Sequence, residues 1–348
     1  MIDDNDTNLS MAKNVLKDKY RVMTMQSAAK MFSLMEKVFP DLILLDIEMP
    51  EMDGFEALVR LKKNSSYLDI PVIFLTSVSD SWVEARGFEL GAVDFITKPF
   101  SAPVLFNRVK LHLNLDEMIK DKTAQLLEKI EQMHKMHDSF VHVVANMIEH
   151  RDRESTGHLE RILEYVRILI DAMTSRGVYA DELTQINVGE LISSSLLHDI
   201  GNISVPEAFL NKPGKLTEEE YKVIKRHPME GENIIERIIT RIGSDEEFLH
   251  SAKLFAGHHH EHWDGSGYPG GLGKTEISIQ GRIMAIVDVY DALVSTRPYK
   301  KAYTHNEAVS MIMENAGKQF DPLIAEVFFE VNRKFEFVAL CWEPGRQT

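Results

Sequence analysis

Eight histidine, aspartate and glutamate side chains fall between residues 154 and 288 at spacings that packing alone does not explain. They are Glu154, His158, His198, Asp199, His227, His259, His260 and Asp288. Imidazole and carboxylate groups suit iron, manganese or zinc, and eight donors exceed what one ion needs. Two or three ions in one pocket can hold both the attacking water and the leaving oxygen of a phosphoester. The pattern therefore predicts a metal-dependent phosphohydrolase.

The local sequence around these residues also favours ligands over packing. Glu154 and His158 are four residues apart, so on a helix they share one face. Asp288 lies in an apolar helical run, where a carboxylate without a partner would be costly. A lone histidine is more often a surface or core residue than a ligand, and His258 stays ambiguous in this respect. The joint spacing of the eight makes purely structural roles for all of them much less favoured.

The first hundred residues alternate short apolar runs with helical patterns, which predicts an α/β domain with a parallel sheet. Leu42–Leu45 and Val72–Leu75 are continuous apolar runs, as expected of strands buried on both faces, and Val93–Ile96 is a shorter one. Arg21–Met25 is a weaker strand candidate. Helices are expected near residues 9–20, 28–38, 55–63 and 82–90. Beyond residue 100 the strand signals stop, and the remaining sequence reads as mostly helical.

Polar side chains follow the expected strands. Asp3 and Asp4 come directly after the start of a first strand, and Asp46 ends the first of the apolar runs. The carboxyl ends of parallel strands meet at one edge of a sheet, so three carboxylates there would hold Mg²⁺. Thr76 and Lys98 end the next two strands and would bind a phosphoryl group carried by Asp46. The alternative is that the aspartates only cap a helix and a turn.

Composition and charge limit the classes of protein to consider. The chain has 348 residues, enough for two domains, and a net charge of −15, which argues against general nucleic-acid binding. A small nucleotide substrate needs only a local positive site. No apolar stretch is long enough for a membrane span, and the acidic N-terminus is no secretory signal. The single cysteine, Cys341, fits a reducing cytoplasm.

A long helix is expected between the two chemically active regions. From residue 102 to about 147 the sequence has no glycine and one proline, Pro103, which suits a first helical turn. Residues at alternating steps of four and three could form the seam of a coiled coil. They are Ile119, Thr123, Leu126, Ile130, Met133, His137, Phe140, Val144 and Met147. We expect a linker helix that pairs with its twin in a homodimer; the alternative is a helix packed on its own domain.

The front residues closely resemble a response-regulator receiver domain over about residues 1–110. The resemblance is carried by Asp3-Asp4, Asp46-Ile-Glu-Met-Pro-Glu-Met-Asp-Gly, Thr76 and Lys98-Pro99-Phe100. It implies a doubly wound, flavodoxin-like fold of five strands, bound Mg²⁺, and phosphorylation of Asp46 by a histidine kinase. It also implies switch roles for Thr76 and Phe95 and a cis bond at Lys98–Pro99. Only two residues precede the acidic pair, so we expect a first strand shorter than the family's.

The later motifs resemble the HD-GYP family of phosphohydrolases over about residues 140–335. The matching stretches are Arg151–Arg161, His198-Asp199-Ile-Gly, Lys212-Pro-Gly-Lys215-Leu, His227-Pro228, His259-His260-Glu-His-Trp-Asp-Gly-Ser-Gly-Tyr-Pro269, Asp288-Val-Tyr-Asp-Ala-Leu and Arg297-Pro-Tyr-Lys300. The resemblance implies an all-α domain that hydrolyses cyclic dinucleotides, chiefly cyclic di-GMP and in some members 3′3′-cyclic GMP-AMP. Glu154 looks like the extra ligand of the family's three-metal version, in which iron or manganese is usual.

The same resemblance assigns roles to individual residues. His198 and Asp199 are the expected catalytic pair, with Asp199 bridging two ions while an activated water attacks phosphorus in line. The expected substrate-binding residues are Lys215, Tyr268, Arg297, Lys300 and Asn202. At Asn202 the family normally has a lysine that contacts the scissile phosphate, and a neutral amide would lose a charge-assisted contact. A catalytically weak receptor for the dinucleotide or for a protein is therefore one alternative. A hydrolase for another nucleotide is a second.

Together these patterns predict a multidomain response regulator. We expect a receiver domain at residues 1–103 with a shortened first strand, a linker helix at 104–140, and an HD-GYP phosphodiesterase domain at 141–348. Phosphorylation of Asp46 would gate hydrolysis through the linker helix. The expected partners are a cognate histidine kinase, a cyclic dinucleotide substrate, diguanylate cyclase-type proteins and a second copy of the chain. Neither a nucleic acid nor a membrane is expected.

Overall fold

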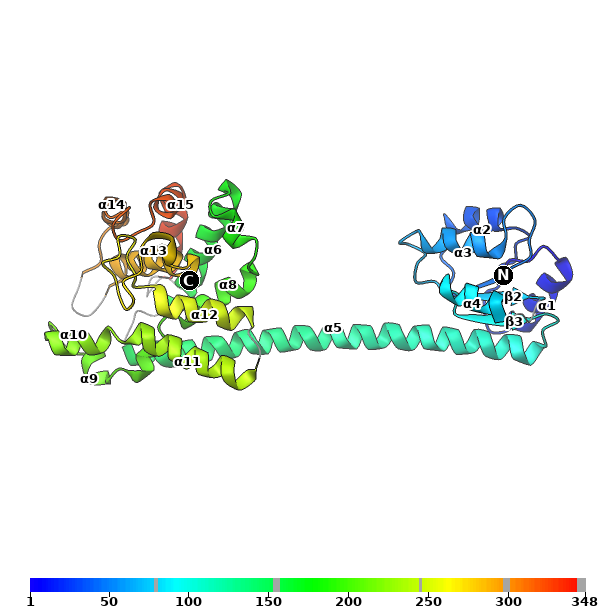
Figure 1. Cartoon of the computed structure of the whole chain (residues 1–348), viewed down its shortest axis with the longest axis horizontal. Helices are drawn as coiled ribbons and strands as arrows, with labels where there is room; N and C mark the ends of the chain where they lie inside the picture. The colour runs from blue at the N-terminus through cyan, green and yellow to red at the C-terminus, as the bar shows by residue number, and fades with distance from the viewer. Residues whose placement is uncertain (78–80, 153–156, 244–245, 297–300, 343–348) are drawn as a thin grey trace. The chain divides into compact units, whose positions relative to one another are not determined.

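The computed structural model describes residues 1–77, 81–152, 157–243, 246–296 and 301–342 (Figure 1). The chain divides into two compact units, Met1–Glu131 and Gln132–Thr348. Three of the predicted site residues, Glu154, Arg297 and Lys300, lie outside the described residues. Among the described helices, none is both long enough and apolar enough to span a bilayer.

The first unit is built on a parallel sheet of three strands. They are β1 (Ile43–Asp46), β2 (Val72–Thr76) and β3 (Asp94–Thr97), which pair in that order. Every residue of β1 and β2 is buried, as the continuous apolar runs predicted. The register sets Phe74 of β2 beside Phe95 of β3.

Ile2 extends this sheet on the other side of β1. It forms parallel bridges with Leu45 and with Met25, and its amide and carbonyl both bond to the backbone of β1. The first strand is therefore a single bridged residue. The weak strand expected at Arg21–Met25 is likewise reduced to one bridge, at Met25. The resulting order, Met25, Ile2, β1, β2, β3, is that of a doubly wound sheet.

Helices cover both faces of the sheet (Figure 1). They are α1 (Asp6–Leu16), α2 (Ala28–Met35), α3 (Gly54–Lys62), α4 (Ser81–Glu89) and the start of α5 (Ala102–Asp152). Leu45 and Phe74 point into the core under α2 and α3, whereas Leu44 and Ile73 point into the core under α1 and α5. This alternation follows from the two-residue period of a strand. The flavodoxin-like prediction is confirmed.

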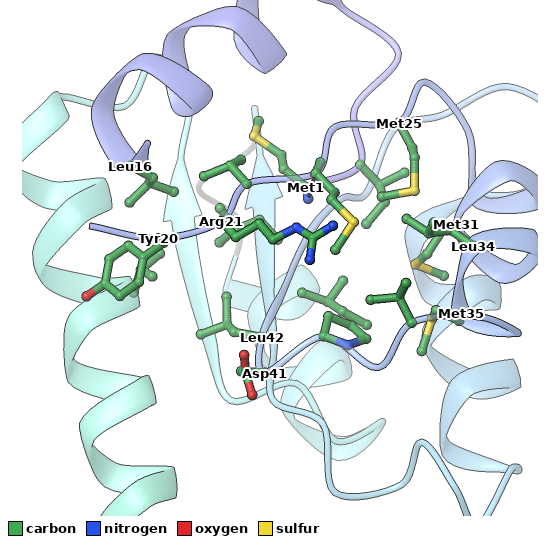
Figure 2. Close-up of a pocket in the computed structure, with 18 of the residues that line it drawn as sticks. Met1, Leu16, Tyr20, Arg21, Met25, Met31, Leu34, Met35, Asp41 and Leu42 are labelled. Atoms are coloured by element: carbon green, nitrogen blue, oxygen red, sulfur yellow. Dashed lines mark hydrogen bonds between the residues drawn. The ribbon is translucent and has the colours of Figure 1, made fainter. Parts of the chain in front are cut away.

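A pocket of about 310 Å³ lies beside Met1, at the amino end of β1 (Figure 2). The side chains of Met31 and Met35 point toward it from α2. The Met1 amino group donates a hydrogen bond to the Met23 carbonyl at 2.8 Å, and burial lowers the pKa of this amine to about 5. This mostly apolar pocket lies at the opposite end of β1 from Asp46.

The helix α5 is 51 residues long and contributes side chains to the cores of both units. Val109 packs in the core of the first unit, and Val141 and Ile148 pack in a core of the second. Between these ends lies an exposed apolar stripe, which we call the α5 stripe. It consists of Ile119, Leu126, Ile130, Met133 and Phe140. The expected long linker helix is confirmed.

Two residues of the predicted coiled-coil seam contact side chains of the second unit. The His137 ring packs edge-on against Phe248 with ring centroids 4.7 Å apart, and Val144 packs beside the same core. His137 nevertheless stays exposed, whereas Val144 is half-buried and Val143 beside it is exposed. Exposed side chains of the predicted seam therefore continue through Phe140 to Met147, with Val144 partly covered.

The second unit is built from helices, as predicted. After α5 come α6 (His158–Arg176), α7 (Ala180–Leu183), α8 (Val188–Ser194), η1 (Ser195–Leu197), η2 (Ile200–Ser204), α9 (Glu207–Leu210), α10 (Glu218–Ile224), α11 (His227–Ile242), α12 (Glu247–His258), η3 (Lys274–Glu276), α13 (Ile279–Val294), α14 (His305–Glu314) and α15 (Pro322–Cys341). One core lies among α6, α8, α13, α14 and α15. A second lies where α11 and α12 pack beside the end of α5 (Figure 1).

Candidate metal centre

Two groups of ligand-type side chains meet in the second unit. One consists of His158, His198 and Asp288, and the other of His227, His259 and His260. Within each group, one ligand atom from every residue lies within 4.8 Å of the others. Four of the five histidines are buried, which is unusual for groups that carry hydrogen-bonding nitrogens unless those nitrogens have partners.

The ends of helices position most of these side chains. His158 and His227 are the first residues of α6 and α11, and His259 directly follows α12. His198 and Asp199 lie between the 3₁₀ helices η1 and η2. Because the backbone turns there, adjacent residues can reach one pocket, which an ideal α-helix would prevent.

Gly201 explains why η2 can approach α11 so closely. A Cβ atom at this position would lie 1.9 Å from the His227 carbonyl oxygen, so any larger residue would force the two elements apart. The His-Asp-Ile-Gly motif therefore has a packing role in addition to its ligands. The glycine brings His198 and Asp199 next to the start of α11.

Asp199 lies between the two groups. One carboxylate oxygen is 3.2 Å from Nε2 of His227 and 3.5 Å from Nε2 of His259, and the other oxygen is 3.7 Å from Nε2 of His198. Burial works to raise the pKa of Asp199, but the neighbouring imidazoles outweigh it and hold the pKa well below its usual range. A carboxylate that stays ionised between two sets of imidazoles is suited to bridge two cations.

Hydrogen bonds fix which ring nitrogen of each histidine faces the centre. Nδ1 of His198, His227 and His259 lies 2.8–2.9 Å from a backbone carbonyl three or four residues earlier. A carbonyl only accepts, so each Nδ1 carries the proton and donates it. In the neutral form of each ring, Nε2 is then the unprotonated atom and points toward the other ligands, as metal coordination requires.

His158 is oriented by a buried ion pair. Its Nδ1 lies 2.8 Å from one oxygen of Asp291, and the Arg161 guanidinium donates to both oxygens of the same carboxylate, at 2.6 and 2.8 Å. Burial alone would raise the pKa of Asp291, but the bonds from Arg161 and His158 lower it to about 2. Sequence reasoning missed Asp291 and Arg161 as supports of a ligand, although both lie in the matched motifs.

The donor set fits divalent metal ions. Nε2 of His227 and Nε2 of His259 are 3.1 Å apart, and their lone pairs would repel unless a cation or a proton lay between the rings. Among the described residues, the buried Nε2 of His198 has no hydrogen-bond partner. Burial also lowers the pKa of His198 and of His260, which favours the neutral imidazole that binds metal.

A glycine-rich loop forms one wall of the centre. The Tyr268 ring contacts the His260 ring in a tilted arrangement with centroids 4.9 Å apart, and its amide donates to the His260 carbonyl at 3.1 Å. Glu261 is buried and accepts hydrogen bonds from the amides of Gly270 and Leu272 at 2.6 and 3.0 Å. The carboxylate thereby folds the loop onto the ligand pair. Sequence reasoning did not single out Glu261 as a support of this loop.

Two other predicted substrate-binding residues, Asn202 and Lys215, differ in how close they lie to the centre. Asn202 is buried and lines a pocket of about 20 Å³ together with Glu149, His158, His198 and Asp199. Lys215 is exposed in the segment before α10. Asn202 thus lies beside the predicted catalytic pair, whereas no contact joins Lys215 to the centre among the described residues.

The first unit holds a separate acidic site at the carboxyl end of β1. Asp3, Asp4 and Asp46 each offer a ligand oxygen within 4.8 Å of the others, which fits an oxygen-binding ion such as Mg²⁺. The Lys98 ammonium lies 2.8 Å from Asp3 and 2.6 Å from Asp46. Burial, with help from the charge of Asp3, raises the pKa of Asp46 despite the opposing effect of Lys98.

The predicted switch residues of this unit lie near the acidic site on neighbouring strands. Thr76 is buried at the end of β2, and Phe95 is buried on β3 against Phe74 and Phe88. The peptide bond between Lys98 and Pro99 is cis, as the resemblance implied.

The chain matches two family models. The model described as a response regulator receiver domain matches residues 1–110, and the one described as an HD domain matches residues 142–324. Among curated relatives, a probable cyclic di-GMP phosphodiesterase of Vibrio cholerae is 36% identical over 97% of this chain and 78% of its own length. The cyclic di-GMP phosphodiesterase response regulator RpfG of Xanthomonas campestris is 33% identical over 97% of this chain and 88% of its own.

A third relative shares mainly the second unit. The 3′3′-cGAMP-specific phosphodiesterase 2 of Vibrio cholerae is 36% identical over 58% of this chain and 35% of its own length. The two domain matches, the two full-length relatives and the paired ligand groups agree with one another. The chain therefore belongs to the response regulators that join a receiver domain to a metal-dependent phosphodiesterase domain of the HD-GYP type.

Proposed function

We propose that the chain hydrolyses a cyclic dinucleotide, cyclic di-GMP or 3′3′-cyclic GMP-AMP, at a centre of two or three metal ions. The position of Asp199 between two groups of ligands is the observation that carries this proposal. Relatives named for each of the two substrates support both choices. Glu154, four residues before His158, is the proposed extra ligand for a third ion.

Iron or manganese ions bound there would activate a water molecule and neutralise the charge that develops on the phosphodiester. The chain's own residues do the positioning. His198 and Asp199 reach the centre from the turn between η1 and η2, and Tyr268 lies against His260 from the glycine-rich loop. Arg297, Lys300 and Lys215 are the proposed phosphate contacts, and the neutral Asn202 beside Asp199 is the proposed contact that lacks a charge.

One experiment tests the hydrolase directly. The protein is loaded anaerobically with iron or manganese, and cyclic di-GMP and cyclic GMP-AMP are followed by chromatography. The control is the double variant His198→Ala, Asp199→Ala. We expect cleavage of at least one dinucleotide by the metal-loaded protein and none by the control. If neither is cleaved although binding is measurable, the receptor alternative that Asn202 suggests replaces the hydrolase.

We also propose that phosphorylation of Asp46 by a histidine kinase, with Mg²⁺ bound at Asp3 and Asp4, gates the hydrolase through α5. The support is that this one helix packs Val109 into the first unit and Val141 into the second. A change in how one end of α5 packs in the first unit would therefore alter how its other end packs in the second unit.

The α5 stripe is the proposed contact with a second copy in a cytoplasmic homodimer. Apolar side chains spaced by three and four residues on an exposed helix are the pattern of a coiled-coil seam. Turnover and oligomeric state should both respond to beryllofluoride, which mimics a phosphoryl group on Asp46. If the complex of protein and beryllofluoride matches the untreated protein in both, this gating is wrong.

A further inference from the structure

Lys225 stands out among the cations near the metal centre because of what surrounds its ammonium. The residue directly follows α10, and its Nζ lies 4.9 Å from the ring centre of Tyr221 and 4.8 Å from that of Tyr268. Tyr221 is four residues earlier, so the two side chains share one face of the helical turn. Tyr268 comes from the glycine-rich loop. The ammonium is thus held between two phenol rings from different elements.

We propose that Lys225 binds a non-bridging phosphate oxygen of the substrate, and that Tyr221 and Tyr268 hold its ammonium in position. The inference rests on the proposed function and adds a residue that neither the motifs nor the relatives assign. It names the class of group recognised, a nucleotide phosphate, and the side of the centre on which that phosphate lies.

The first support is the short path from Lys225 to the ligands. The Lys225 ammonium lies over the Tyr268 ring, and that ring also contacts the ring of His260 in a tilted arrangement, at 4.9 Å between ring centroids. The ammonium is therefore one aromatic ring away from the candidate centre.

The second support is the absence of a counter-charge. Within the described part of the chain, no carboxylate lies within ion-pair distance of Lys225, whereas Lys212 and Lys253 pair with Glu220 and Glu236 at 2.6 and 2.8 Å. Lys225 is half-buried, and the net charge of the chain is −15. A half-buried cation without an anion, in so acidic a protein, is suited to receive an anionic ligand.

The third support is the chemistry of the arrangement. A ring face attracts an ammonium but accepts few of its N–H bonds, so the three donors of Lys225 stay available to an oxygen ligand. A lysine ammonium acts as a compact point charge, which suits a phosphate oxygen. The neutral Asn202 supplies no such charge near Asp199. Lys225 supplies one on the side of His260.

The test compares Lys225→Met and Lys225→Arg with Lys222→Met, a matched loss of an exposed lysine on α10. Each variant is loaded with manganese, its metal content is measured, and KM and kcat are determined for the dinucleotide that the unaltered protein cleaves. We expect Lys225→Met to raise KM by roughly tenfold to a hundredfold, as loss of one charge-assisted bond would, with kcat changed much less. Lys225→Arg should restore most of the affinity, and Lys222→Met should leave KM unchanged.

A second measurement separates this inference from the proposed function. Binding of inorganic phosphate to the manganese-loaded protein is followed by calorimetry with the same variants, and it does not depend on turnover. Weaker phosphate binding by Lys225→Met at unchanged metal content supports the inference even if no dinucleotide is cleaved. A KM within twofold of the unaltered protein, phosphate binding equal to it, or a loss of affinity that appears only together with loss of metal, overturns the inference.

Discussion

A substitution at Asp291 can show whether this residue supports only the stability of the second unit or also its affinity for metal. Replacing Asp291 with Asn keeps the shape of the side chain but removes its charge and one of its acceptor oxygens. The amide would then face donors from Arg161 and His158 with one acceptor and an NH₂ group of its own. Arg161 is 4% exposed, so its charge would stay in the interior without the negative charge of Asp291 beside it.

The expected cost to folding is large. Removing one partner of a buried ion pair typically costs about 3–5 kcal/mol, because the remaining charge is uncompensated. The pKa of Asp291 gives an independent figure of similar order. The drop from 3.8 to about 2 corresponds to about 2 kcal/mol of stability. Because the folded-state pKa is the lower one, this contribution is present above pH 3.8 and is lost as the pH falls toward 2.

The effect on metal affinity is separate. Loss of the acceptor that orients a ligating histidine typically weakens metal binding by about tenfold to a hundredfold. The matched control is Asp321→Asn, because Asp321 also pairs with a buried arginine, Arg282, at 3.2 Å but bonds to none of the proposed ligands among the described residues. Both variants should unfold at lower urea concentration. Only Asp291→Asn should release manganese to a chelator more readily.

Urea unfolding and chelator titration of the metal-loaded chain give the two readouts. The double variant Arg161→Met, Asp291→Leu should recover stability, because an apolar pair can replace a buried ion pair at little cost. It should not recover metal affinity, since nothing would then orient His158. Equal metal affinity in Asp291→Asn and Asp321→Asn would refute the positioning role of Asp291.

Two further changes test other parts of the molecule. Gly201→Ala should destabilise the second unit by about 1–3 kcal/mol and lower its metal content, because the new methyl group would meet the His227 carbonyl. Thermal unfolding and metal analysis check this prediction, and an unchanged melting temperature would contradict it. Lys98→Ala should abolish phosphorylation of Asp46 by a small phosphodonor as fully as Asp46→Asn does, because it removes the ammonium that contacts Asp46. Phosphate-affinity gels measure this, and phosphorylation that remains in Lys98→Ala would show that the ammonium is dispensable.

Much of the fold followed from local patterns in the sequence. The runs at Leu42–Leu45 and Val72–Leu75 predicted buried strands, and the glycine-free stretch from residue 102 predicted a long helix. The face that α5 presents was harder to predict. His137 and Val144 fit the seven-residue period of the seam, but His137 also contacts Phe248, and Val144 is partly covered by the core of the second unit. A sequence period cannot show which of two apolar neighbours a partner element will cover.

In the candidate site, the ligands could be predicted from the sequence, whereas the residues that support them could not. Ligands of a common centre must be of a few residue types, so His198, Asp199 and their partners could be recognised from type and spacing alone. Supporting residues have no such constraint. Lys225 is one of many lysines in the sequence, and only the fold sets its ammonium between a ring four residues earlier and Tyr268, 43 positions later. Substrate preference should depend on such supporting contacts, because the proposed ligands would hold ions that act on a phosphodiester, and every cyclic dinucleotide has that group.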